Sequence, residues 1–206
     1  MLRIWGRTNS TNVQKVLWCL GELDIAYERI EAGGQFGVVN TPGYLAMNPN
    51  GLVPTIDDDG FILWESNVIV RYLSHRHGQG TLFPTDVRAR FTAEKWMDWQ
   101  GGTLWPAFRD AFLGLVRMPP DKRDHAAIEK SQRDTATKLA GLETALGATP
   151  FVAGERFTMG DIPLGVSIYR CFALGIDRGG FPNIARWYDR LTERPAFEEH
   201  VMLPIT

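Results

Sequence analysis

Three short groups of residues in the first third of the chain offer side-chain or backbone polar groups that could together bind a small anionic peptide. The first is Ser10-Thr11-Asn12, where a short apolar segment gives way to a helical pattern. The start of a helix exposes unpaired backbone N–H groups and the positive end of the helix dipole. A hydroxyl there could donate a hydrogen bond to a bound anion, or these residues could serve only as helix caps.

The second group is Val53-Pro54, at the start of an apolar strand pattern. Proline cannot donate a hydrogen bond to a neighbouring strand, so it belongs at a strand start or a bend. If the bond is cis, Val53 would turn its backbone N–H and C=O outward, where they could pair with an extended peptide. The alternative is an ordinary trans proline at a sheet edge, which is the commoner state.

The third group is Glu65-Ser66, at the expected start of another helix. A carboxylate beside a hydroxyl and free N–H groups could bind the head group of an amino acid. The ammonium would contact Glu65, and the carboxylate would contact Ser66 and the helix end. Simple helix capping is the alternative for this pair as well.

An alternation of strand and helix patterns positions these groups. Strand patterns at 2–6 and 25–30 flank a helical repeat that begins at Val13, so the chain opens as β-α-β with parallel strands. A loop rich in Gly, Asn and Pro follows at 33–51, and it could contain one short helix. After this loop the sequence predicts strands at 53–56 and 61–64 and a helix at 65–76. The expected order is therefore β-α-β-α-β-β-α, within residues 1–78.

Strand patterns disappear after a linker near residue 80. A long helical pattern covers 88–116, with a bend expected near Pro106 because proline disturbs a helix interior. Further helical patterns occupy 122–146, 158–173, 183–191 and 196–202. We therefore expect residues 87–206 to form an all-helical bundle domain.

Composition limits the classes of function. The 206 residues are 44% hydrophobic and carry a net charge of only −2, which gives no attraction to nucleic acid or to an anionic membrane. No segment reads as a signal peptide or as a membrane-spanning helix. Cys19 and Cys171 lie far apart and lack the spacing of a metal site, so we expect no metal and two buried, reduced thiols. A cytoplasmic location follows as an expectation.

Taken together, these features resemble the cytosolic glutathione S-transferase family, and in particular its bacterial, serine-type, theta-like members. The resemblance covers essentially the whole chain. It rests on the segment Asn48-Pro49-Asn50-Gly51-Leu52-Val53-Pro54, on Asp58-Asp59-Gly60 and on the stretch from Leu63 to Leu73. The segment from Phe157 to Ile162 also looks like the family's N-capping box, with Thr158 and Asp161 as its members.

The resemblance implies how glutathione would be held. It implies a thioredoxin-like first domain, a cis Pro54, a peptide paired with the backbone of Val53, and a γ-glutamyl end bound by Glu65 and Ser66. Leu52 would also belong to this glutathione site, although Lys or Gln is common there in the family. No residue can be assigned to the glycine carboxylate, for which the loop at 33–37 is a candidate.

The implied activity is that of a glutathione transferase. The enzyme would stabilise the thiolate of glutathione for attack on an electrophilic, largely apolar substrate. Ser10 is the expected donor to the thiol, because the loop contains neither tyrosine nor cysteine, but Asn12 and Thr11 remain candidates. One alternative is a glutathione-dependent disulfide reductase or peroxidase that uses Asn12 or Thr11. Another is a non-catalytic glutathione-binding or interaction protein.

The electrophile is expected between Ser10 and the long helix. Trp105, Arg109 and Phe112 are candidates to line its pocket. Core packing of the aromatic residues and a surface or interdomain ion pair of Arg109 are the alternatives. The resemblance further implies a homodimer.

Overall fold

A four-stranded mixed sheet forms the centre of the N-terminal part in the computed structural model, which describes all residues from 1 to 206. The strands lie in the order β2-β1-β3-β4, with the bounds β1 (Leu2–Trp5), β2 (Tyr27–Ile30), β3 (Thr55–Asp58) and β4 (Phe61–Trp64). β1 and β2 are parallel, because helix α1 (Thr11–Glu22) carries the chain back between them. β3 is antiparallel to both β1 and β4.

A two-residue turn joins β3 to β4. Asp59 and Gly60 both have positive φ, at 52° and 94°, as the tightest hairpin turns require. The predicted strand at 53–56 instead begins at Thr55, so Val53 and Pro54 precede the ladder. This difference follows from the missing N–H of Pro54, which cannot join a ladder. The Val53–Pro54 bond is cis, as the family resemblance implied.

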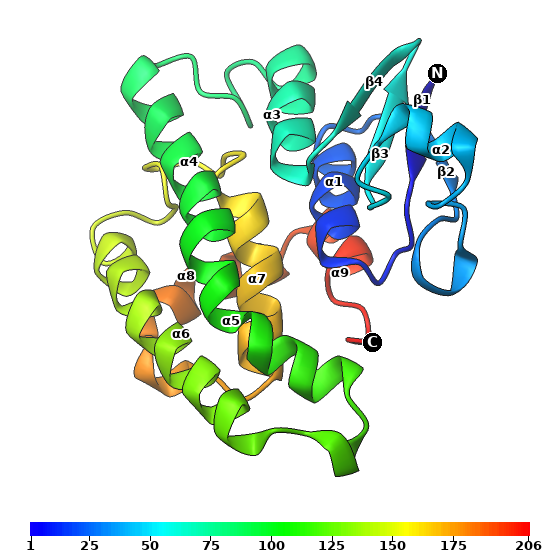
Figure 1. Cartoon of the computed structure of the whole chain (residues 1–206). Helices are drawn as coiled ribbons and strands as arrows, with labels where there is room; N and C mark the ends of the chain where they lie inside the picture. Colours follow the sequence, from blue (N-terminus) through cyan, green and yellow to red (C-terminus); the bar gives the residue numbers. More distant parts are fainter.

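Helices cover both faces of the sheet. α1 and α3 (Ser66–His77) lie on the face toward the helical part, and α2 (Pro42–Met47) lies on the other side (Figure 1). Every residue of α1 from Val13 to Leu20 is buried, so this helix is enclosed between the sheet and the C-terminal helices. On the other face, Tyr44 of α2 packs with Trp5 and Ala32 in a small separate core.

The C-terminal part is entirely helical, as predicted. Its α-helices are α4 (Val87–Trp99), α5 (Trp105–Phe112), α6 (His125–Leu146), α7 (Asp161–Ala173), α8 (Pro182–Thr192) and α9 (Pro195–His200). Short 3-10 turns occur in this part at η4 (Pro120–Lys122) and η5 (Arg178–Gly180), and in the N-terminal part at η1 (Gly34–Phe36). The fold class predicted from the sequence is thus confirmed: a thioredoxin-like α/β part followed by a helical bundle.

The long helical pattern at 88–116 is interrupted by two π-helical segments, η2 (Gln100–Leu104) and η3 (Leu113–Arg117). In η2 the backbone N–H of Trp105 donates to the carbonyl of Gln100, five residues earlier. Pro106 follows at once, has no N–H and would crowd a carbonyl four residues back. The wider turn accommodates the proline, so the predicted disturbance at Pro106 takes the form of a π segment.

Thr158 and Asp161, the members of the predicted capping box, are hydrogen-bonded to each other at the start of α7, but the N-cap residue of this helix is Gly160 and not Thr158. A side-chain oxygen of Asp161, Oδ2, accepts from the backbone N–H of Thr158 at 2.9 Å, and the Thr158 hydroxyl accepts from the N–H of Gly160 at 3.3 Å. The other oxygen of Asp161 accepts from the Trp187 indole at 2.9 Å and from the Val152 N–H at 3.0 Å. The carboxylate therefore joins α7 to α8 and to the loop before it, a role that the sequence motif did not indicate.

The two parts share one continuous core. A cluster of 40 buried residues runs from Leu2 to Val201. At its edge Arg194 donates to both carboxylate oxygens of Glu22, at the end of α1. Cys19 and Cys171 are buried within it as free thiols, and burial raises the pKa of Cys19 to about 12. None of the helices is both long and apolar enough to cross a membrane.

Candidate active site

A cavity between the α/β part and the helical part adjoins a second cavity that only residues of the α/β part line. The larger has a volume of about 560 Å³, within the usual range of small-molecule sites, and the smaller about 110 Å³. The lining residues common to both are Asn12, Leu52, Glu65 and Ser66. The three groups identified in the sequence therefore converge on one place, although they are up to about 55 residues apart in the chain.

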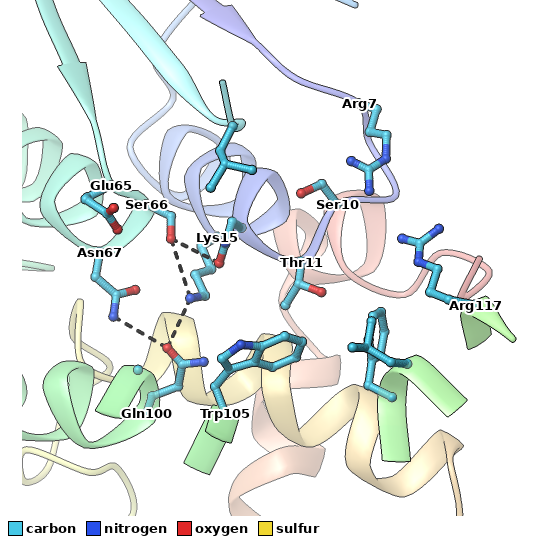
Figure 2. A pocket seen from close by; sticks show the side chains of 15 residues that line it. Arg7, Ser10, Thr11, Lys15, Glu65, Ser66, Asn67, Gln100, Trp105 and Arg117 are labelled. Carbon is cyan, nitrogen blue, oxygen red and sulfur yellow. Dashed lines mark hydrogen bonds between the residues drawn. The ribbon is translucent and has the colours of Figure 1, made fainter. Parts of the chain in front are cut away.

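The start of α1 supplies one wall of the larger cavity. Ser10 is the N-cap residue, and its side chain accepts no capping hydrogen bond and has no other partner within the chain. The residue is 9% exposed and lines the cavity together with Thr11 and Asn12 (Figure 2). No acidic residue occupies the first turn, so the positive helix end is not neutralised locally. A small anion would find both a hydroxyl donor and a favourable potential here.

Val53 and Pro54 line the smaller cavity. Val53 lies outside the sheet ladder, and its backbone N–H and C=O make no hydrogen bond within the chain. The segment is nevertheless fixed, because the carbonyl of Leu52 accepts from the Tyr44 hydroxyl at 2.6 Å and from the Asn48 amide at 2.9 Å. A rigid segment with a free donor and a free acceptor is suited to pairing with an extended peptide.

Glu65 and Ser66 line both cavities at the start of α3. Glu65 has φ of 74°, which is unusual for a residue other than glycine and costs on the order of 1–3 kcal/mol. Its carboxylate has neither an ion pair nor a hydrogen bond within the chain, so the strained backbone holds an unpaired acid at the cavity. Asn67 also lines the larger cavity, and its Oδ1 is buried without a partner within the chain. The two acceptors together could bind an ammonium group.

A buried lysine connects these residues to the helical part. Nζ of Lys15 donates to Oε1 of Gln100 at 3.0 Å and lies 3.5 Å from Oγ of Ser66. Gln100 in turn donates to the hydroxyl of Ser167 in α7 at 2.9 Å. Burial lowers the pKa of Lys15 to about 7, and the nearby charge of Arg170 acts in the same direction.

The helical part contributes the apolar wall. Trp105, Phe112 and Leu113 line the larger cavity. The ring centroids of Trp105 and Phe112 are 5.6 Å apart. Arg109, which the sequence placed with them, does not line the cavity. Its side chain is 58% exposed and lies 3.6 Å from Asp110. An ion pair of Arg109 at the surface was the alternative to a place in the electrophile pocket in the sequence analysis, and the structure has this ion pair.

Seven residues that line the larger cavity were missed by the sequence reasoning: Gly101, Leu113 and the polar residues Arg7, Lys15, Asn67, Gln100 and Arg117. Only Lys15 carried a usable signal, since it lies within an apolar helical segment that two layers would enclose. The side chain of such a lysine must either find a buried partner or face a cavity. The others depend on contacts between distant segments.

The family is decided by comparison with known proteins. A model of the N-terminal domain of glutathione S-transferases matches residues 6–81, and one of the C-terminal domain matches residues 126–190. Glutathione S-transferase GstB of Escherichia coli strain K12 is 47% identical over 208 residues, covering 100% of both chains. The chain belongs to the glutathione S-transferase family.

Solved structures of glutathione transferases agree with this membership. The theta class enzyme of the citrus canker pathogen Xanthomonas axonopodis pv. citri, with glutathione bound, has a TM-score of 0.95 and 46% identity, over 100% of this chain and 99% of that one. The Bombyx mori glutathione transferase BmGSTD1 has a TM-score of 0.87 and 29% identity, over 97% and 92% of the two chains. The protein is therefore a glutathione transferase, an enzyme whose co-substrate is glutathione.

Proposed function

We propose that this glutathione transferase holds the peptide backbone of glutathione in the smaller cavity and reacts it with an electrophile in the larger one. The γ-glutamyl ammonium would contact Glu65 and Oδ1 of Asn67, and the α-carboxylate would contact Ser66 and the start of α3. The free backbone groups of Val53, beside Pro54 and Leu52, would pair with the cysteinyl residue. This arrangement directs the sulfur toward the start of α1.

Ser10 would then stabilise the thiolate. A free thiol has a pKa of about 8.5, so only a small fraction is ionised at neutral pH. A hydrogen bond from the Ser10 hydroxyl and the positive end of α1 both favour the anion. The thiolate attacks an electrophilic carbon, a carbon–sulfur bond forms, and a leaving group such as chloride departs with its electron pair. The thiol proton is released to solvent, so no general base is needed. The single observation that carries this proposal is the unpartnered Ser10 hydroxyl on the cavity wall.

Replacement of Ser10 tests the assignment. For Ser10→Ala we expect kcat/KM with 1-chloro-2,4-dinitrobenzene to fall on the order of 100-fold, as when one preorganised donor is lost. The pKa of bound glutathione, read from the thiolate absorbance, should rise toward that of the free thiol. Thermal stability should change little, because the hydroxyl has no partner within the chain. Ser10→Thr is the matched control and should retain most of the activity.

Replacement of Asn12 distinguishes the transferase from the alternative of a disulfide reductase or peroxidase. Oδ1 of Asn12 accepts from the Ser66 hydroxyl at 3.2 Å, so Asn12→Ala should mainly raise KM for glutathione. If Asn12→Ala abolished reduction of small disulfides while Ser10→Ala left it intact, the reductase or peroxidase alternative would replace the transferase as the main activity. Unchanged thiol pKa in Ser10→Ala would remove Ser10 from its role.

We also propose that the enzyme is a homodimer and that it acts in the cytoplasm. Exposed apolar side chains on neighbouring elements support the dimer: Phe61 on β4, Val68 on α3, and Val87 and Phe91 on α4. A twofold axis would bring this surface against its own copy. The two reduced, buried cysteines are consistent with a reducing compartment.

A further inference from the structure

The side chains that line the larger cavity include more basic groups than acidic ones. Arg7, from the segment after β1, and Arg117, at the end of η3, both line it. Glu65 is the only carboxylate among the lining residues. Figure 2 shows both guanidinium groups on one side of the cavity, with Glu65 and Asn67 on the other.

Neither arginine has an acidic partner. No salt bridge and no side-chain hydrogen bond within the chain involves Arg7 or Arg117, whereas Arg3, Arg71, Arg76 and Arg194 all pair with carboxylates. Arg7 is partly buried, and burial together with the charge of Arg117 lowers its pKa. Two guanidinium groups that repel each other beside a cavity, without a neutralising acid, are arranged to bind an anion.

The helix geometry directs Arg117 to this position. In a regular α-helix a residue five positions after Phe112 would be rotated by about 140° from it. The η3 segment instead closes a turn of five residues, with the N–H of Met118 donating to the carbonyl of Leu113 at 3.1 Å. The guanidinium of Arg117 consequently lies 5.8 Å from the centre of the Phe112 ring, on the same wall. The charged group and the aromatic wall are thus parts of one surface.

We propose that Arg7 and Arg117 form an anion-binding site for the second substrate, which is a planar, aromatic electrophile carrying a carboxylate or a similar anionic group. This inference rests on the proposed function and specifies its substrate class. The ring would pack against Trp105 and Phe112 while its carboxylate bridges the two arginines. The electrophilic carbon would then face the sulfur near Ser10.

The carboxylate that binds Arg7 and Arg117 could also be the glycine carboxylate of glutathione. The cavities favour the electrophile, because the smaller one, which holds Val53, Pro54 and Glu65, includes neither arginine. Arg117 also comes from the helical part and contacts the aromatic ring. The experiment therefore has to distinguish these two carboxylates.

Two electrophiles of matched shape provide the test, 4-chloro-3,5-dinitrobenzoate and 4-chloro-3,5-dinitrobenzamide. Their kcat/KM values are each divided by the uncatalysed rate constant with glutathione, which removes their different intrinsic reactivity. We expect the wild type to prefer the benzoate. Arg117→Gln and Arg7→Gln should each lower the benzoate value about tenfold and leave the benzamide value within about twofold. Arg109→Gln, an exposed arginine on the same helical stretch outside the cavity, is the matched control and should change neither.

A binding measurement keeps this inference separate from the proposed function. The unreactive 3,5-dinitrobenzoate and 3,5-dinitrobenzamide are titrated by calorimetry into enzyme saturated with S-methylglutathione. Binding of the benzoate that depends on the arginines supports the inference even if neither chlorinated compound is turned over, a result that would contradict the proposed function alone. If the enzyme turns over both chlorinated compounds and its preference for the benzoate does not depend on the arginines, the inference is overturned. The proposed function is then unaffected.

A third arm compares glutathione with γ-glutamylcysteine, which lacks the glycine. If Arg7→Gln or Arg117→Gln raises KM for glutathione about tenfold but does not affect γ-glutamylcysteine, the arginines hold the glycine carboxylate. That result overturns their assignment to the electrophile. If each substitution changes KM for glutathione and KM for γ-glutamylcysteine by the same factor, the assignment of the arginines to the electrophile is supported.

Discussion

Lys15 is an ionisable residue in the buried middle of α1, where most of the other side chains are apolar. Burial lowers its pKa to about 7, from an ordinary value of 10.5. Between these two pH values the unfolded chain binds a proton that the folded chain does not. The free energy of unfolding should therefore increase with pH in this window, by about 1.4 kcal/mol per pH unit, and this gain should be lost as pH falls from 10.5 to about 7.

Lys15→Met removes this group and should remove the slope with it. Urea denaturation at pH 7.5 and 9.5 should show the wild type gaining roughly 2–3 kcal/mol relative to the variant. Lys130→Met, at an exposed position where Lys130 pairs with Asp134, is the control and should show no comparable change. Parallel pH profiles of the wild type and Lys15→Met would mean that the lysine is not held neutral in the folded state.

At the scale of elements, α4 approaches the start of α7 closely at Gly160. A Cβ atom at Gly160, just before α7, would lie 2.8 Å from Cα of Ala93 and 2.9 Å from its carbonyl oxygen in α4. Because the obstacle is backbone, one helix would have to move away. We expect Gly160→Ala to lower the free energy of unfolding by about 1–3 kcal/mol, measured by urea denaturation.

Gly141 in α6 is the matched control for this substitution. A Cβ atom there would meet nothing within 4 Å, so only the helix preference of alanine acts. Gly141→Ala should raise the free energy of unfolding by about 0.5–1 kcal/mol. Similar effects of the two substitutions, in either direction, would show that the approach of α4 to α7 is not tight.

The assembly state belongs to the scale of the whole molecule. Phe91 is 56% exposed on α4, in the apolar surface that we propose as the twofold interface. Phe91→Glu would place two like charges across the axis and leave them poorly solvated. Light scattering should then give a mass near the 23.2 kDa of one chain, whereas the wild type should give twice that value.

Phe36→Glu serves as the control at this scale. Phe36 is also exposed, at 40%, but it lies in η1 and outside the proposed interface, so this variant should remain dimeric. A wild-type enzyme with the mass of a single chain would contradict the dimer directly. Dissociation of both variants would show that added charge, and not the position of Phe91, weakens the assembly.

The sequence by itself determined the order of the elements and the groups that could do chemistry. Ser10 at a helix start and Glu65-Ser66 at another are recognisable because helix caps depend on residues that are neighbours in the chain. The same local signals indicated the interaction of Thr158 with Asp161. The resemblance to glutathione S-transferases added the cis state of Pro54, which composition and spacing could not.

Only the tertiary structure decided which side chains of the long helix reach the cavity. Arg109 fits an ideal helical pattern with Trp105 and Phe112 but faces solvent, whereas Arg117 reaches the cavity because η3 shifts the helical phase. Lys15 and Gln100 meet although 85 residues separate them. A local pattern specifies local backbone geometry, but a cavity wall is made by segments that come together only when the layers pack, so its composition cannot be found from spacing along the chain.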